Sequence, residues 1–411
     1  MRAPDGIAKS ASPSASTIRP LEIPSKKHFA ELDALRGIAA LAVVFHHYGL
    51  LQNHRSYVKF LLHVLFNGHS AVILFFALSG FVLALPQARG GRQLYNSFLV
   101  RRICRIYLPY LGALLLALLG DAFIHNRVAL SPFFNNTWSV PITFRLVLSH
   151  ILFIGDYNYT QVNAPFWSLV HEMRISLLFP LFCWGLYRLR IKTALVVLAG
   201  SSIAATLLAF AFPSVEREFA TLHYVAIFGL GAMLALHVSE VSDWYCAQNL
   251  AIKLGLFVFA AFLFVSRTEA LAERTGFLAD VPVALGAILL ITLSLASARL
   301  KAILNHRIPM FFGRISYSLY LVHATVLFTL INLLHARLSP EFMFAVYLVS
   351  TLGLSWTFWK FVEAPSARLG RRLCTALDAR ATRTGALSGE TRLANELTRP
   401  GAEKELTIAK I

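Results

Sequence analysis

The sequence predicts an all-α, polytopic integral membrane protein with about ten transmembrane helices. Hydrophobic residues make up 57% of the 411 residues and charged residues only 14%, whereas soluble domains average about 45–50% apolar and about 25% charged residues. The mean hydropathy is +0.62. A water-soluble fold of this length needs more polar side chains for its surface, so lipid must cover part of the protein. This composition excludes a disordered chain, a secreted disulfide scaffold and an ordinary cytosolic enzyme.

Ten apolar segments are each long enough to cross the hydrocarbon core, which takes roughly 20 helical residues. In chain order they are residues 32–51, 70–86, 98–120, 166–187, 193–212, 219–238, 249–266, 281–297, 311–334 and 342–363. Residues 143–155 are apolar but too few to span, so we expect an interfacial or re-entrant segment there. The sequence contains no internal repeat.

The two ends of the chain lack the pattern of a folded domain. Residues 1–28 are rich in Ser, Ala and Pro and contain no apolar core of a signal peptide, so we expect a disordered cytoplasmic lead. Residues 373–411 mix charges without apolar periodicity, and we expect a disordered cytoplasmic tail. The predicted membrane domain is therefore residues 29–372.

The net charge of +17 is distributed as expected for a membrane protein. With the N-terminus inside, the segments on that side hold more than twice as many Lys and Arg residues as the segments opposite. An even number of spans then places both termini in the cytoplasm. No soluble basic domain is present, so we expect no nucleic-acid partner. The four cysteines form no C-x-x-C pair, which favours reduced, structural cysteines and no metal site.

In the first span, Arg36 and His47 are placed to act together. Their spacing of eleven residues is three helical turns plus about 20°, so both lie on one face, about 16 Å apart. His46 points about 80° away from this line. A charged side chain within a span needs a partner, a cavity or a function. A snorkelling anchor for Arg36 and a packing role for His47 remain open alternatives.

Arg102 and Arg105 open the third span and share a helix face, because they are three residues apart. Arginine suits phosphate binding, since its planar fork donates two hydrogen bonds at once. The alternative is an ordinary cluster of positive charge at the cytoplasmic edge. Together with Arg36, these residues predict an anion-binding site near the inner membrane surface.

Glu172 lies in the otherwise apolar fourth span, and we expect it at a depth similar to that of His47, near the outer surface. A carboxylate there would fix the tautomer of His47 and raise its basicity, as a general base requires. In the ninth span, His323 lies mid-membrane and shares a face with Tyr320. Structural roles remain open for Glu172 and for His323, which could be a hydrogen-bonded core histidine.

These residues suggest two classes of function. An arginine cluster facing the cytosol and a His/Glu pair near the far side suit an enzyme that takes a phosphorylated donor from inside and modifies an acceptor outside. A proton-coupled transporter also uses His, Glu and Arg within the membrane. Transporters commonly contain inverted repeats, and the absence of internal symmetry here favours the enzyme.

Four motifs stand in order along the chain: LDALRGIAALAVVFHH, FFALSGFVL, RRICRIYLPY with FWSLVHEMRISLLFP, and FFGRISYSLYLVH. With them, the stretch from Ala30 to Arg372 resembles the membrane-bound acyltransferase-3 family, which includes bacterial polysaccharide and lipopolysaccharide O-acetyltransferases. Many members have a second acidic residue and a tyrosine where Met173 and Ser176 stand here. The common Trp-Pro pair after the last histidine is replaced by residues 324–325, Ala-Thr.

The resemblance implies transfer of an acyl group, usually acetyl, from acyl-CoA to a hydroxyl of a glycan or lipid-linked sugar at a bacterial inner membrane. No permanently bound cofactor is expected. The implied CoA-binding residues are Arg36, Arg102 and Arg105. The implied catalytic residues are His47, as base or transient acyl carrier, Glu172, which would orient it, and His323, a donor to the oxyanion. The expected substrate-binding residues are Trp167, Ser168 and Tyr320, of which Tyr320 is a second candidate oxyanion donor. The acyl chain length, the choice between direct transfer and an acyl-enzyme, and the oligomeric state remain open.

Overall fold

A computed structural model describes residues 29–50, 67–91, 94–124, 130, 132–153 and 159–383, and these residues form helices and connecting turns with no strand. Within them, eight helical stretches are long and apolar enough to cross a membrane. These are Gly68–Ala88, Tyr95–Phe123, Phe166–Arg188, Ile191–Ala211, Pro213–Leu236, Glu269–Ala296, Arg307–Leu334 and Pro340–Ala381. The predicted all-α, polytopic membrane fold is confirmed.

The two remaining predicted spans are also helical. The first is α1 (Ala30–Gly49), and the other is α13 (Leu250–Val265), whose 16 residues are fewer than the roughly 20 that cross a bilayer upright. The long helices that surround the functional region are α3 (Gly68–Ala88), α5 (Leu108–Phe123), α9 (Phe166–Arg188), α10 (Ile191–Ala211), α11 (Glu216–Leu236), α15 (Asp280–Ala296), α17 (Arg307–Leu334) and α18 (Pro340–Phe358).

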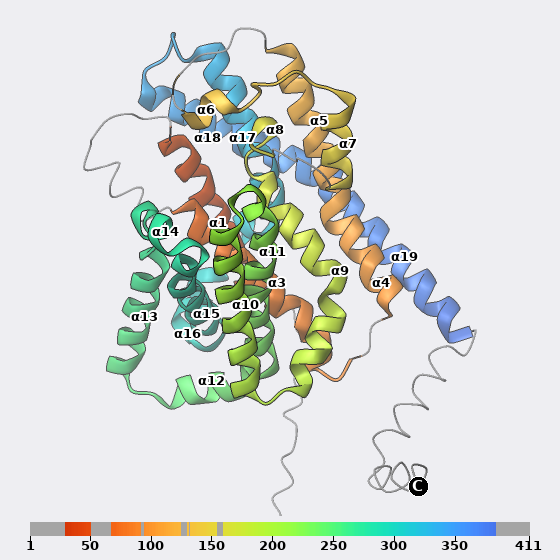
Figure 1. The fold of residues 1–411 in the computed structure, drawn as a ribbon, viewed down its shortest axis with the longest axis vertical. Helices are drawn as coiled ribbons and strands as arrows, with labels where there is room; N and C mark the ends of the chain where they lie inside the picture. Colours follow the sequence, from red (N-terminus) through yellow and green to blue (C-terminus); the bar gives the residue numbers. More distant parts are fainter. Residues whose placement is uncertain are drawn as a thin grey trace, which may run out of the picture.

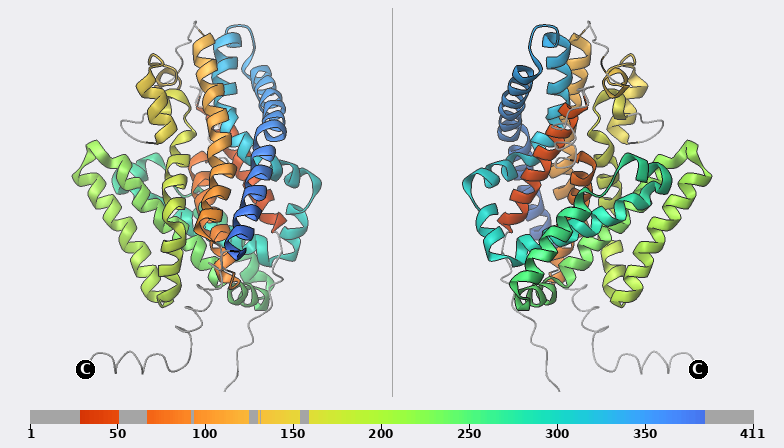
Figure 2. Two further views of the ribbon diagram at one scale, coloured as in Figure 1. Left: turned by 90° about the vertical axis from the view of Figure 1, so that its right-hand side faces the viewer. Right: turned by 90° about the vertical axis from the view of Figure 1, so that its left-hand side faces the viewer.

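Shorter helices connect these elements. They are α4 (Tyr95–Arg102), α6 (Pro132–Asn136), α7 (Phe144–Leu152), α8 (Tyr159–Val162), α12 (Val238–Ala247), α14 (Glu269–Thr275) and α16 (Ala298–Leu304), with 3₁₀ turns η2 (Pro213–Val215) and η3 (Gly276–Ala279). The predicted interfacial segment 143–155 contains α7, which has only nine residues. Views from two opposite sides show α5, α17 and α18 reaching the same end of the molecule (Figure 2).

Close helix crossings at glycine organise the centre. α1 crosses α17 where Gly37 faces Gly313, and a Cβ atom on Gly313 would lie 2.5 Å from the carbonyl oxygen of Asp33. Without side chains at this point the two backbones touch, which is how small residues drive helix packing in membranes. The crossing brings Arg36 and Arg314, the neighbours of the two glycines, to the same region of the protein.

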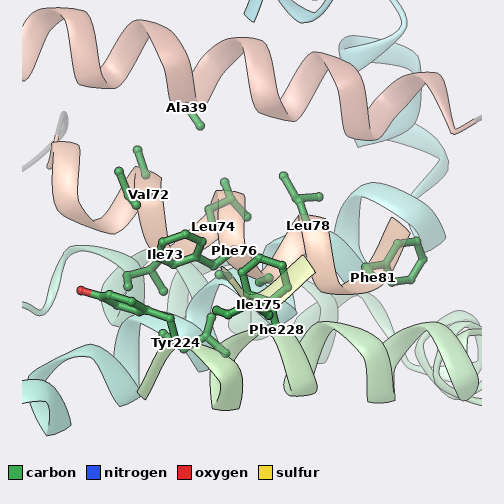
Figure 3. Packing of buried hydrophobic residues seen from close by; sticks show 14 of the residues in the cluster. Ala39, Val72, Ile73, Leu74, Phe76, Leu78, Phe81, Ile175, Tyr224 and Phe228 are labelled. Carbon is green, nitrogen blue, oxygen red and sulfur yellow. The ribbon is translucent and has the colours of Figure 1, made fainter. Parts of the chain in front are cut away.

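A second crossing joins α3 to α11. A Cβ on Gly80 would collide with the backbone of Phe228. Phe76, Phe81 and Phe228 are fully or almost fully buried beside this crossing. Ala39 of α1 points toward the opposite side of α3, which carries Leu74 and Leu78 (Figure 3). By contrast, α10 and α13 expose large apolar side chains such as Leu207, as helices do when lipid covers their outer faces.

Two helix runs contain a π-helical turn. η1 (Ile103–Tyr107) joins α4 to α5, and η4 (Trp359–Glu363) joins α18 to the last helix, α19 (Ala364–Arg383). A π-turn leaves backbone groups without their usual partners, and such turns are frequent at functional sites. In η1, the Tyr317 hydroxyl donates to the carbonyl of Ile106 at 2.8 Å, and Ser366 donates to the carbonyl of Cys104.

α19 runs beside α4 (Figure 1). The Ser97 hydroxyl donates to Asp378 at 2.5 Å, and the Cys374 thiol donates to the carbonyl of Ser97 at 3.0 Å. The tail predicted to be disordered from residue 373 is therefore helical as far as Arg383 and packed on α4 through Cys374 and Asp378, by contacts that no apolar pattern records. The predicted lead 1–28 and tail residues 384–411 lie outside the described residues.

Candidate active site

A cavity of about 430 Å³ lies among α1, η1, α9, α17 and α19. Among the described residues, its wall carries six arginines and three carboxylates. The arginines are Arg36, Arg102, Arg105, Arg314, Arg368 and Arg371, and the carboxylates are Asp33, Glu172 and Glu363. A neighbouring hollow of about 500 Å³ shares Asp33, Arg36, Ser79, Arg102 and Arg105 with it and continues to Arg89 and Arg101. The excess of positive charge suits this region to binding an anion.

Arg102 is the most enclosed of the cavity arginines and is held by a network on α9. Its Nη2 lies 3.0 Å from Oε1 of Glu172, and its Nε and Nη2 donate to the Ser176 hydroxyl at 3.2 and 2.7 Å. The Ser79 hydroxyl donates to the same carboxylate oxygen at 3.0 Å. Ser176, which departs from the family pattern, therefore helps to orient this guanidinium.

This network corrects the expected partner of Glu172. Its hydrogen bonds go to Arg102 and Ser79 rather than to His47. The predicted depth assumed that α9 begins at the membrane surface. Instead, Asn163 and Phe166 at the start of the helix are fully buried inside the protein, so counting residues from a surface does not locate Glu172, which contacts Arg102.

The structure brings the three predicted CoA-binding residues to one cavity. Arg36 pairs with Asp33 on its own helix at 3.3 Å. Arg105 has no carboxylate within 4 Å in the described part of the chain. A guanidinium without a carboxylate partner keeps its hydrogen-bond donors for an incoming anion.

His47 contacts His323 from across the α1–α17 crossing. Nδ1 of His47 lies 3.2 Å from Nε2 of His323 and 2.9 Å from the carbonyl oxygen of Val43. Nδ1 of His323 lies 2.8 Å from the carbonyl oxygen of Tyr320 and 3.1 Å from that of Leu319. His323 is fully buried.

These contacts determine the tautomers of the neutral pair. Carbonyl oxygens only accept, so Nδ1 of His323 must carry a proton and its Nε2 must accept. Nδ1 of His47 then donates, both to Val43 and to His323. The unprotonated nitrogen of His47 is therefore Nε2, the atom that a general base uses. Nδ1 of His47 thus meets the Val43 carbonyl, which holds the ring in place, and His323, which accepts a second hydrogen bond; Glu172 meets neither nitrogen in the described contacts.

Tyr320 separates the arginine cavity from the histidine pair. Its ring lines the cavity, and its centroid lies 6.0 Å from that of His323. Its hydroxyl donates to the carbonyl of Pro165 at 3.0 Å and lies 2.8 Å from the Ser168 hydroxyl. The single hydroxyl proton is thus already used, which leaves Tyr320 suited to form a wall rather than to donate to an oxyanion.

Trp167, one residue before Ser168, does not line either hollow. Its half-buried ring stacks on His69, with centroids 5.8 Å apart and an angle of 10° between the planes. Nε2 of His69 lies 2.9 Å from both carboxylate oxygens of Asp280, and Nε of Arg267 donates to one of them at 2.7 Å. This buried charge network was not predicted, although an aspartate at the start of an apolar span is the signal that could have revealed it.

Comparison with known proteins agrees with this site. The family model described as an acyltransferase domain, that of acyltransferase-3, matches residues 29–360. A protein from Rhizobium radiobacter, "Protein 2 in picA locus", is 30% identical over 210 residues, which are 45% of this chain and 97% of that protein. The peptidoglycan O-acetyltransferase OatA of Listeria monocytogenes is 22% identical over 375 residues, which are 84% of this chain and 57% of OatA. No solved structure matches.

The matched range contains Arg36, Arg102 and Arg105 of the cavity and both histidines of the pair. The match favours an enzyme over the transporter that the sequence alone left open. Since the family model covers most of the chain and eight helices can span a bilayer, this multi-pass membrane protein belongs to the acyltransferase-3 family and is an O-acyltransferase.

Proposed function

We propose that the protein transfers an acyl group, most simply acetyl, from acyl-CoA to a hydroxyl of a glycan or lipid-linked sugar. The observation that carries the proposal is the arginine-lined cavity, whose inner end at Tyr320 adjoins the His47–His323 pair. The similarity to a peptidoglycan O-acetyltransferase supports a glycan acceptor. The proposal places the protein in a bacterial inner membrane with both termini in the cytoplasm, so that the cavity opens to cytosolic acyl-CoA.

Donor binding rests on the three arginines Arg36, Arg102 and Arg105. Phosphate oxygens accept paired hydrogen bonds from a guanidinium fork, which a lysine cannot reproduce. Arg102 is already oriented by Glu172 and Ser176, so less side-chain freedom is lost when the donor binds. The role of Glu172 is thus to position an arginine, and the pantetheine arm would extend from these residues toward Tyr320.

Acyl transfer then needs one base and one route for the proton. Nε2 of His47 takes the proton of the acceptor hydroxyl as its oxygen attacks the thioester carbonyl. The tetrahedral oxyanion collapses, the carbon–sulfur bond breaks, and the departing thiolate takes the proton back from His47. A carbon–oxygen bond replaces a carbon–sulfur bond, and the products are the ester and free CoA. His323 stabilises the transient imidazolium, because its Nε2 accepts from Nδ1 of His47.

The acceptor has candidate contacts near the same place. Trp167 offers an aromatic face held flat by His69, and the Ser168–Tyr320 pair fixes the adjoining wall. Sugars present an apolar face that packs on aromatic rings, together with hydroxyls that need partners. We therefore infer that Trp167 contacts the acceptor, whereas Ser168 and Tyr320, which both line the arginine cavity, lie at the boundary with the donor.

The test is acyl transfer by membranes that contain the protein. Radiolabelled acetyl-CoA should transfer its label to a glycan in wild-type membranes, and His47→Ala and Arg36→Ala should abolish the transfer while the proteins still insert. His335→Ala is the matched control, because His335 lies exposed just beyond the end of the same helix as His323. Wild-type label transfer by a folded His47→Ala protein would overturn the mechanism.

The acceptor itself can be found by comparing strains. Surface polysaccharide from a deletion strain should lack acyl groups that the parent strain carries and that mild base removes. Mass spectrometry before and after base treatment gives both the sugar and the acyl chain length. Identical spectra from the two strains would contradict a surface glycan as acceptor.

A further inference from the structure

Three cavity arginines lie at the rim and are not used by the mechanism above. Arg314 comes from α17, and Arg368 and Arg371 come from α19. All three side chains are exposed, and none has a carboxylate within 4 Å among the residues that the structure describes. Arg36 and Arg102, by contrast, each have a carboxylate partner, and Arg105 has none among the described residues. The rim therefore carries positive charge that no described carboxylate pairs with.

The rim arginines are held in place by the packing of two helices. Arg368 and Arg371 are three residues apart and share a face of α19. Between them, Gly370 packs against Cys104, where an added Cβ would lie 2.7 Å from the cysteine side chain. The guanidinium of Arg314 lies 5.8 Å from the centroid of the Trp359 ring, a cation–π contact that limits its movement. One face of α19 is thus docked while the other presents charge to the cavity.

We propose that Arg314, Arg368 and Arg371 form a second phosphate subsite, which binds the 3′-phosphate of coenzyme A. The proposal rests on the proposed function and extends it to donor specificity. Coenzyme A carries a diphosphate beside its pantetheine arm and a separate phosphomonoester on the ribose, at the opposite end of the molecule. The cavity offers two matching groups of arginines, one inside and one at the rim.

Depth decides which group takes which phosphate. The arm that bears the acyl group must point inward, toward Tyr320 and the histidine pair. The diphosphate next to the arm then meets the inner group, in which Arg102 is only 9% exposed and Arg36 is half-buried, while Arg105 is exposed between this group and the rim. The ribose phosphate stays near the mouth, where the exposed rim arginines lie. A phosphomonoester bears a charge of about −1.5 to −2 at neutral pH, which suits several unpaired guanidinium groups.

The experiment compares acetyl-CoA with 3′-dephospho-acetyl-CoA as donors. Purified protein is placed in nanodiscs of neutral phosphatidylcholine, so that anionic lipid headgroups cannot occupy the rim. Wild-type protein should have a KM for acetyl-CoA about tenfold lower than for the dephospho compound, since exposed charge-assisted hydrogen bonds are individually modest. Arg368→Gln/Arg371→Gln should raise the KM for acetyl-CoA to the dephospho value and leave kcat and the dephospho KM unchanged.

Arg372→Gln is the matched control. Arg372 is exposed on the same helix and does not line the cavity, so this variant should keep the wild-type preference. Equal KM values for both donors in wild-type protein, or equal losses for both donors in the double variant, would overturn the subsite and leave the acyltransferase reaction standing. Failure of wild-type protein to use either donor would instead overturn acyl-CoA as the donor.

Discussion

The His47–His323 contact allows a quantitative prediction about how the base is supported. In His323→Ala, Nδ1 of His47 still donates to the carbonyl of Val43 at 2.9 Å, so the tautomer and orientation of the ring should persist. What is lost is the acceptor 3.2 Å away that stabilises the imidazolium during transfer. A neutral hydrogen bond contributes about 0.5–1.5 kcal/mol and one to a charged group about 1.5–3 kcal/mol. The difference, about 1–1.5 kcal/mol, corresponds to a loss of roughly tenfold in kcat.

A double-mutant comparison separates this positioning role from direct catalysis. His47→Ala removes the base and should lower kcat by about 10²–10⁴. Because His323 acts through His47, the double variant His47→Ala/His323→Ala should be no slower than His47→Ala alone. His323→Gln offers an acceptor oxygen and should recover part of the loss. The assay is steady-state release of CoA at saturating acetyl-CoA. Losses that multiply in the double variant would refute the reasoning and favour His323 as a donor to the oxyanion.

Three further changes test the packing and the charges around the site. Gly313→Ala should lower the thermal unfolding temperature in detergent, because its methyl group would overlap the backbone of α1. Gly200→Ala is the control, since an added methyl group there meets open space. The same unfolding temperature for Gly313→Ala and the wild-type protein would contradict the tight crossing. Asp280→Asn should lower the free energy of unfolding by less than the about 3–5 kcal/mol of a fully buried pair, since it leaves a half-buried arginine and histidine without their carboxylate. An unchanged unfolding temperature would show that the network is not stabilising. Arg102→Lys should raise the KM for acetyl-CoA roughly 10-fold through loss of the guanidinium fork. Arg188→Lys is the control and should leave this KM unchanged, because Arg188 stacks on an exposed tryptophan. The same KM for Arg102→Lys and the wild-type protein would argue against donor binding at Arg102.

The membrane fold followed from composition because lipid imposes a simple rule on helices. Segments of roughly 20 apolar residues must be helical, since no water satisfies their backbone groups. The same rule makes charges within spans informative, and it led to Arg36, Arg102 and Arg105, which the structure gathers at one cavity. Helical periodicity within single spans was sufficient to select these arginines, because all three lie at or near the same edge of their spans.

Contacts between helices could not be predicted in the same way. Glu172 was assigned to His47 from residue counts, but the buried start of α9 places it beside Arg102 instead. The His47–His323 pair depends on the glycine crossing of α1 and α17, which the separate sequence patterns do not specify. The sequence patterns did not single out Arg368 and Arg371, because α19 is polar and its docking depends on a few specific hydrogen bonds.

The wall formed by Tyr320 has a consequence for the membrane as a whole. A cavity that water can fill from one side reduces the thickness of protein that blocks ions from crossing the membrane. A path for the acceptor from the other side would reduce this thickness further. The Tyr320 hydroxyl, tied to Pro165 and paired with Ser168, closes this remaining thickness together with the fully buried His323. The enzyme must therefore also block the passage of protons across the membrane. A variant in which a small side chain replaces Tyr320 should be tested for proton leakage as well as for loss of acyl transfer. Such a leak would dissipate the proton gradient of the cell, a cost unrelated to the ester that the enzyme makes.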